Sequence, residues 1–183
     1  MSPDIAQALR ATVRERRSFL VMAVPRLAGK STVTAAMLGS RPRSMPLRTI
    51  GIDGDEIDAL LEESAGGYIE IPEISSGPHA PGYIWGAKVR RVFAGVGPSV
   101  ALAAALHAPD PGEAFAIICR GCGVPDRDAA KVKLAVYLRS LGEWQRPTRR
   151  VVATVHEIDG VSEGRPRARL LFRWDEESDR FAS

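Results

Sequence analysis

The chain alternates continuous apolar runs with segments in which apolar residues recur every three or four positions. The run over residues 18–24 is apolar without interruption, which is typical of a strand buried on both faces. Before it, Ile5, Leu9 and Val13 stand four positions apart, which predicts a helix over residues 5–17. The same criteria predict further helices over residues 30–38, 56–63, 84–93, 111–120 and 126–130, and further strands over residues 47–52, 68–71, 100–106, 132–138, 149–158 and 167–174.

This order of elements predicts the fold class. Strands and helices alternate along most of the chain, which indicates an α/β fold around a mainly parallel sheet. The last two strands, joined by a turn region at residues 160–166, are expected to pair as an antiparallel hairpin. A length of 183 residues favours one domain, so we expect a single unit over residues 1–183 with its core at 18–158. The polar segment 175–183 is expected to be a flexible tail.

Composition excludes several classes of protein. The chain is 45% hydrophobic and 26% charged, as is ordinary for a globular domain, and its sequence contains no apolar run near the ~18 residues of a membrane span. The N-terminus lacks the basic and apolar regions of a signal peptide, so we expect a cytoplasmic protein. The net charge of +3 and the 6% of aromatic residues argue against a nucleic-acid partner, although arginine clusters at residues 14–17 and 41–43 keep that alternative open.

Two cysteines, Cys119 and Cys122, form one C-x-x-C pair. One such pair cannot complete a four-ligand zinc site, and the three histidines have no metal-ligand spacing. We interpret both as plain thiols in a reducing compartment, with a redox motif as the alternative.

The strongest local motif lies where the first predicted strand meets the next helix. Gly29-Lys30-Ser31-Thr32 follows the apolar run and a short loop, as in a phosphate-binding P-loop of the form G-x-x-x-x-G-K-[ST]. Such a loop binds phosphate with successive backbone N–H groups, and glycine provides the left-handed conformations that this requires. Here Val24 and Leu27 stand where P-loops carry further glycines. The alternative is an ordinary helix start after a strand.

Other polar residues follow the predicted strands, namely Asp53, Asp55, Glu73 and His107. Because ligands of parallel sheets bind at the carboxyl ends of strands, we expect these side chains to meet near Lys30. In phosphoryl transfer, Glu73 would orient water, Asp53 and Asp55 would hold Mg²⁺ or polarise the nucleophile, and His107 would contact the γ-phosphate. Each residue also has a purely structural alternative. Residues 53–55 could form a turn, Glu73 could be an ordinary loop acid, and His107 could be a buried, hydrogen-bonded histidine.

Taken together, these segments resemble the ATPases of type II and type IV secretion and type IV pilus assembly, a superfamily of RecA-like P-loop enzymes. Residues 68–75, Tyr-Ile-Glu-Ile-Pro-Glu-Ile-Ser, are similar to the Walker B box of that family, and Leu106-His107-Ala108 resembles its histidine box. Residues 49–56 are loosely similar to the aspartate box of the family. Residues 149–152 are similar to its Arg-Arg-Val run. The likeness covers most of residues 18–158.

The resemblance implies a RecA-like three-layer sandwich that binds ATP and Mg²⁺. Residues Ala28, Gly29, Lys30, Ser31 and Thr32 would then bind the nucleotide with Asp53 and Asp55, Ser31 would ligate Mg²⁺, and Glu73 and His107 would be catalytic. Partners would be secretion or pilus proteins, and several copies could assemble as a homo-oligomer.

The sequence also departs from the family pattern. Pro72 replaces the Walker B glycine, and residues 1–17 are too short for the family's N-terminal domain. Two functions therefore stay open beside nucleic-acid binding. The first is an ATP-binding domain that hydrolyses ATP slowly. The second is a degenerate module that does not hydrolyse ATP and acts in regulation or protein–protein interaction.

Overall fold

The computed structural model describes the whole chain except residues 1–2, 25–26, 52–55, 78–80, 144 and 183. The helical elements are α1 Pro3–Arg14, α2 Lys30–Leu38, α3 Ile57–Glu63, α4 Ala87–Gly95, α5 Pro111–Ala116, the π-helical turn η1 Ile117–Gly121 and α6 Asp126–Ala129. The strands are β1 Ser18–Ala23, β2 Leu47–Thr49, β3 Tyr68–Ile74, β4 Tyr83–Ile84, β5 Ala101–Leu106, β6 Val132–Glu143, β7 Arg146–Ser162, β8 Arg165–Asp175 and β9 Arg180–Ala182.

The described strands form one sheet in the order β2-β3-β5-β1-β6-β7-β8-β9, with β4 paired to β3. The pairs β2–β3, β3–β4, β3–β5, β5–β1 and β1–β6 are parallel. The pairs β6–β7, β7–β8 and β8–β9 are antiparallel. The central strand β1 therefore has a parallel neighbour on each side, and all six of its residues are buried. The predicted α/β class, with a mainly parallel sheet and a C-terminal antiparallel hairpin, is confirmed.

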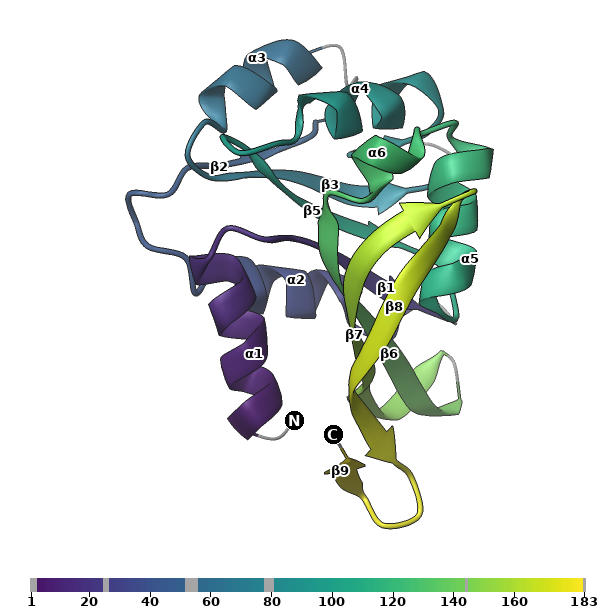
Figure 1. The fold of residues 1–183 in the computed structure, drawn as a ribbon. Coiled ribbons are helices and arrows are strands. Elements are labelled where there is room, and N and C mark those ends of the chain that lie inside the picture. Colours follow the sequence, from purple (N-terminus) through teal and green to yellow (C-terminus); the bar gives the residue numbers. More distant parts are fainter. Residues whose placement is uncertain (1–2, 25–26, 52–55, 78–80, 144, 183) are drawn as a thin grey trace.

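Helices cover both faces of this sheet (Figure 1). On one face α1 and α2 pack against Phe19 and Val21, and on the other α3 to α6 cover the side to which Leu20 and Met22 belong. Successive β1 residues thus enter two different cores, which explains why this strand lacks the alternation of a half-exposed strand. The first helix has the amphipathic pattern predicted for it, with Ile5, Leu9 and Val13 all buried.

Two predicted boundaries were wrong in ways that matter for the site. Strand β3 continues through Pro72 and Glu73 to Ile74, so Glu73 lies within the strand and not after it. Pairing of β3 with β5 shifts in register between Ile71 and Ile74, around a proline that has no N–H to donate. The helix expected from residue 84 begins at Ala87, because Tyr83–Ile84 forms the added strand β4.

The C-terminal strands are longer than predicted. Strands β6 and β7 extend beyond the predicted 132–138 and 149–158, and the tail expected to be flexible contains β9, which pairs with β8. Trp174 anchors this end, since its Nε1 donates to the Asp179 carboxylate at 2.9 Å and two arginines, Arg139 and Arg149, lie over its ring. The polar residues of this segment can thus form a strand pair, because the buried Trp174 packs at this end of the sheet.

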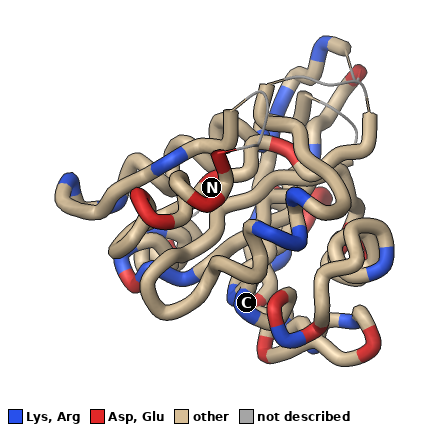
Figure 2. The backbone as a smooth tube through the Cα atoms, turned by 90° about the horizontal axis from the view of Figure 1, so that it is seen from above, with Lys and Arg blue, Asp and Glu red and all other residues tan. Residues whose placement is uncertain are grey.

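Charged residues of both signs are interspersed along the backbone, as Figure 2 shows. No helix among the described residues is long and apolar enough to cross a membrane.

Candidate functional site

The loop between β1 and α2 adopts the left-handed conformations that a phosphate-binding loop requires. Gly29, the residue before α2, has φ 95°, and Leu27 has φ 67°. Leu27 therefore takes the backbone conformation of the glycine that it replaces, at a cost of about 1–2 kcal/mol for a residue with a Cβ. Val24, at the other expected glycine position, does not have a positive φ. Valine is thus tolerated at that position without left-handed strain.

Strand β7 holds this loop in place. Arg150 Nε donates a hydrogen bond to the Leu27 carbonyl oxygen at 2.7 Å, which fixes the strained residue from a position 123 residues away. Gly29 is favoured by its φ angle, and a Cβ there would lie 3.2 Å from Arg150 Cδ, a tight contact that a small shift of the arginine would relieve. Between the two left-handed residues, Ala28 is buried. Arg150 was not among the predicted site residues, because nothing local in the sequence links it to the loop.

Three charged or polar side chains meet next to this loop. The Lys30 ammonium lies 3.3 Å from Glu73 Oε2, and it lies 3.1 Å from His107 Nε2. Lys30 and Glu73 are only 11% and 6% exposed in their side chains. The structure therefore brings together Lys30, Glu73 and His107, as the sequence predicted.

The parallel sheet explains the meeting. Strand β5 pairs in parallel with both β1 and β3, so the carboxyl ends of all three strands lie at the same edge. Lys30 begins the helix after β1, His107 follows β5, and Glu73 comes from the irregular end of β3.

The contacts of His107 define its tautomer. Its Nδ1 atom lies 3.1 Å from the Ala23 carbonyl oxygen, which can only accept a hydrogen bond. The Lys30 ammonium lies 3.1 Å from Nε2 and 3.3 Å from Nδ1, so the Ala23 contact favours a proton on Nδ1 and leaves Nε2 to accept from the lysine. The imidazole thus connects the end of β1 to the lysine in one fixed orientation.

Glu73 is incompletely paired. Its Oε1 atom is buried and has no hydrogen-bond partner among the described residues, and the nearest imidazole nitrogen, His107 Nε2, is 3.9 Å away. An unsatisfied buried carboxylate oxygen is rare in folded proteins and calls for a polar group that the described residues do not supply.

A cavity of about 790 Å³ opens over these groups. One side consists of the loop and the start of α2, including the exposed Ser31 and Thr32. The opposite side is largely apolar and comes from β6 and β7, with Leu138, Val151 and Val152. The size lies within the roughly 300–1,000 Å³ of small-molecule sites, and the mixture of apolar wall and convergent charges is typical of them.

All predicted site residues that the structure describes line this cavity, namely Ala28, Gly29, Lys30, Ser31, Thr32, Glu73 and His107. Asp53 and Asp55 lie outside the described residues. Sequence reasoning missed Arg150, Tyr83 and the apolar wall.

The cysteine pair does not take part. Cys119 and Cys122 are free thiols, and burial raises the pKa of the Cys119 thiol to about 11. A thiol with a raised pKa is a poor nucleophile at neutral pH. Within the described part of the chain, no group of three or more His, Cys, Asp or Glu side chains could hold a metal ion.

Comparison with solved structures shows that two known ATPases share this fold. The VirB11 ATPase from the type IV secretion system of Brucella suis, solved in complex with sulphate, matches with a TM-score of 0.61 and 16% identity, over 83% of this chain and 51% of that one. The ATPase DotB of Legionella pneumophila matches with a TM-score of 0.56 and 13% identity, over 96% of this chain and 50% of that one. The chain has the fold of type IV secretion ATPases.

This secretion-ATPase fold confirms the resemblance that the sequence motifs indicated. The chain spans about half the length of the two ATPases. No family model matches the chain, and no curated protein matches it. At these identities the fold is shared, whereas the chemistry must be argued from the site.

Proposed function

We propose that the chain binds Mg-ATP in the 790 Å³ cavity and hydrolyses it. The observation that carries the proposal is the convergence of Lys30, Glu73 and His107 beside a loop in which Leu27 and Gly29 are left-handed. This combination supplies a cation, a carboxylate and a backbone cradle within one cavity, which are the parts that phosphoryl transfer uses.

Each residue has a role that follows from its position. Lys30, at the first turn of α2, would neutralise phosphate charge together with the backbone N–H groups of the helix start. Glu73, with one buried oxygen unpaired, would orient the attacking water. His107, held by Ala23, would contact the γ-phosphate, and the apolar wall of β6 and β7 would receive the base.

The site also fits Mg²⁺. Ser31 is exposed in the cavity next to Lys30, and a hydroxyl at this position of a P-loop can ligate the ion. Held there with ATP, Mg²⁺ would supply positive charge that stabilises the negative charge of the phosphates. Asp53 and Asp55 remain predicted contributors to the same ion.

Two observations favour the alternative of a module that does not hydrolyse ATP. A leucine occupies a glycine position of the loop, and the Lys30 ammonium is already engaged by Glu73 and His107. A nucleotide would have to compete with these contacts.

The names of the two matched ATPases motivate a proposal about partners. VirB11 is described as part of a type IV secretion system. We propose that this chain likewise serves a secretion or pilus machine, in an assembly of several copies.

The deciding experiment is calorimetric titration of Mg-ATP into the parent chain, Lys30→Ala and Arg17→Ala. Arg17 is a matched control because it is a cation at the other end of β1, outside the cavity. Lys30→Ala is expected to weaken binding at least tenfold, since a hydrogen bond to a charged group is worth about 1.5–3 kcal/mol. Arg17→Ala should bind as the parent does.

Circular dichroism would confirm that both variants fold. Equal affinity of the parent and Lys30→Ala, or no binding by the parent at millimolar nucleotide, would overturn the proposal.

A further inference from the structure

A second cavity, of about 450 Å³, lies between the helical segment α5–η1 and the strands β7 and β8. Its lining includes Glu113 and Arg120 on the helical side, and His156 and Arg165 on the strand side. It shares no lining residue with the cavity above Lys30. Nothing in the proposed function uses it.

Among the described residues, its two arginines have no side-chain partner. In the described part of the chain, neither Arg120 nor Arg165 forms an ion pair or donates a hydrogen bond from its guanidinium, whereas Arg17, Arg149 and Arg169 all pair with carboxylates. Glu113 is the one acidic residue of the lining. The charged side chains around this cavity therefore sum to a positive charge, and two planar donors are available to oxygen atoms.

His156 adds an unsatisfied polar atom. Its Nδ1 is buried and finds no hydrogen-bond partner among the described residues. Burial, and then the nearby Arg173, lowers the pKa of this imidazole below its ordinary 6.5, against an opposing effect of Asp110. The lowered pKa favours the neutral imidazole, which can donate a hydrogen bond from one ring nitrogen and accept one at the other.

The backbone segments that carry the two arginines pack against each other. The turn before Arg165 is anchored by the Asp126 carboxylate, which accepts hydrogen bonds from the backbone N–H groups of Glu163 at 2.7 Å and Gly164 at 2.9 Å. Gly164 has φ 69°, and a Cβ there would lie 3.2 Å from Cys119 Cβ, next to Arg120. This close packing orders the turn against the helical wall before any ligand arrives, which reduces the entropy cost of binding.

We propose that this cavity binds a small organic anion whose carboxylate or phosphate oxygens are held by Arg120 and Arg165. The apolar part of the ligand would lie against Ala116, Pro166 and Ala168, which complete the lining. The volume suits a ligand at the lower end of the small-molecule range. Glu113 at the same cavity opposes a second negative charge, so it limits the charge of the ligand.

The chain's three histidines make a direct test simple, because each imidazole signal can be assigned by one substitution. Inorganic phosphate and, separately, succinate would be titrated into isotope-labelled protein while the histidine NMR signals are recorded. We expect the His156 signals to shift to saturation with at least one probe, and that probe identifies the oxyanion group. His107 lies beside Lys30 and reports on the other cavity independently.

Matched variants separate specific binding from general attraction. Arg120→Gln and Arg165→Gln are each expected to weaken the His156 titration at least tenfold, and Glu113→Gln to tighten it. Arg127→Gln is the control, since Arg127 is an exposed arginine of α6 outside the cavity. The proposal is overturned if the His156 signals stay fixed with both probes, or if they shift equally in the parent and in the Arg120→Gln/Arg165→Gln variant.

Discussion

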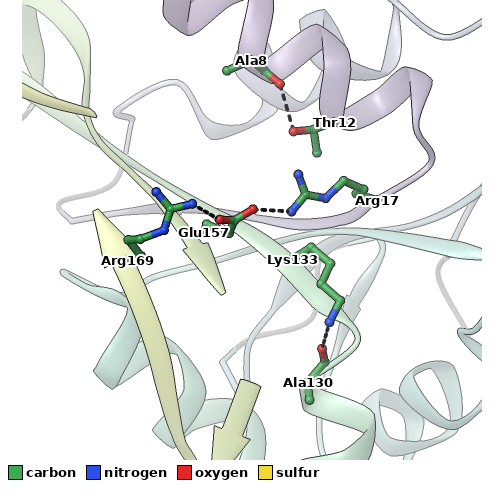
Figure 3. Close-up of polar contacts among 7 residues, drawn as sticks. All are labelled: Ala8, Thr12, Arg17, Ala130, Lys133, Glu157 and Arg169. Carbon is green, nitrogen blue, oxygen red and sulfur yellow. Dashed lines mark hydrogen bonds and ion pairs between the residues drawn. The ribbon is translucent and has the colours of Figure 1, made fainter. Parts of the chain in front are cut away.

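Two clusters centred on a glutamate lie at opposite ends of β1, and they differ in how completely the glutamate is paired. At the end where β1 begins, Glu157 of β7 lies between Arg17 and Arg169 (Figure 3). At the end where β1 stops, Glu73 of β3 lies beside Lys30 and His107. Both clusters join segments that are far apart in the sequence.

The Glu157 cluster is partly exposed, and both of its carboxylate oxygens are paired. One carboxylate oxygen accepts from Arg17 at 2.8 Å and the other from Arg169, whose side chain is 62% exposed. These hydrogen bonds hold the pKa of Glu157 below its ordinary range. The Glu73 cluster is buried. Among the described residues, the shortest contact of its carboxylate is the 3.3 Å to Lys30, and its Oε1 atom has no hydrogen-bond partner.

We infer from this difference that the Glu157 cluster is structural and that the Glu73 cluster belongs to the proposed nucleotide site. A carboxylate near the surface whose two oxygens both accept hydrogen bonds joins strands and needs no further partner. A buried carboxylate oxygen without a hydrogen-bond partner costs stability, and proteins retain such groups mainly where a ligand or water supplies the missing hydrogen bond.

The largest expected effect comes from removing the charge of each glutamate in turn. Glu73→Gln should lower the rate of ATP hydrolysis by about 10²–10⁴-fold, the usual contribution of a positioned general base, while Mg-ATP still binds. Glu157→Gln should leave the rate unchanged. Phosphate release under saturating Mg-ATP would measure both.

The result that would contradict this prediction is hydrolysis by Glu73→Gln at the parent rate. Absence of turnover in the parent, with Mg-ATP bound, would instead support the non-hydrolysing alternative.

The sequence was sufficient to predict the members of the Glu73 cluster but not its surroundings. Lys30, Glu73 and His107 each stand at or near the end of an apolar run, and parallel strands bring such ends together. The position of Glu73 inside β3 was not predictable from the run itself, because proline usually ends a strand pattern and here it lies at a register shift.

The contacts made by the C-terminal strands were beyond sequence reasoning. Arg150 reaches Leu27 only because β7 pairs with β6, and β6 with β1, and no local pattern encodes that distance. Likewise, the second cavity depends on how the turn before Arg165 packs on α6 and η1, through Asp126 and Gly164. Such features follow from tertiary packing between segments of low local signal.

Replacing Arg150 is expected to change the affinity for Mg-ATP by a smaller factor, and it tests whether Arg150 positions the loop. Arg150→Met should weaken Mg-ATP binding about tenfold, because a lost hydrogen bond of about 1.4 kcal/mol would no longer hold Leu27 left-handed. Adding Leu27→Gly should restore affinity, since glycine adopts this conformation without help. Calorimetry on the parent, the two single variants and the double variant would measure the coupling.

Arg149→Met is the matched control for that cycle. Arg149 is the neighbouring arginine on β7, and it pairs with Asp179 at 2.7 Å, outside the cavity. It should bind Mg-ATP as the parent does. If Leu27→Gly failed to rescue Arg150→Met, the arginine would act by touching the nucleotide and not by positioning the loop.

The smallest effect concerns the stability that the Glu157 cluster supplies. Because its folded pKa lies below the ordinary 4.5, the charged carboxylate stabilises the fold at any pH above that value. The stabilisation is lost as the pH falls through the lower, folded pKa. Partly exposed pairs are screened by solvent, so we expect Glu157→Gln to reduce the free energy of unfolding by about 1 kcal/mol at most at pH 7.

Urea unfolding of the parent and Glu157→Gln at a series of pH values would test this expectation. The stability difference should be constant between pH 5 and pH 7, and shrink toward zero as the pH falls further below 4.5. Added salt should shrink it as well, because the arginines are exposed to counterions. A difference that persisted unchanged at low pH and high salt would show that packing around Glu157, and not its charge, joins β7 to the start of β1.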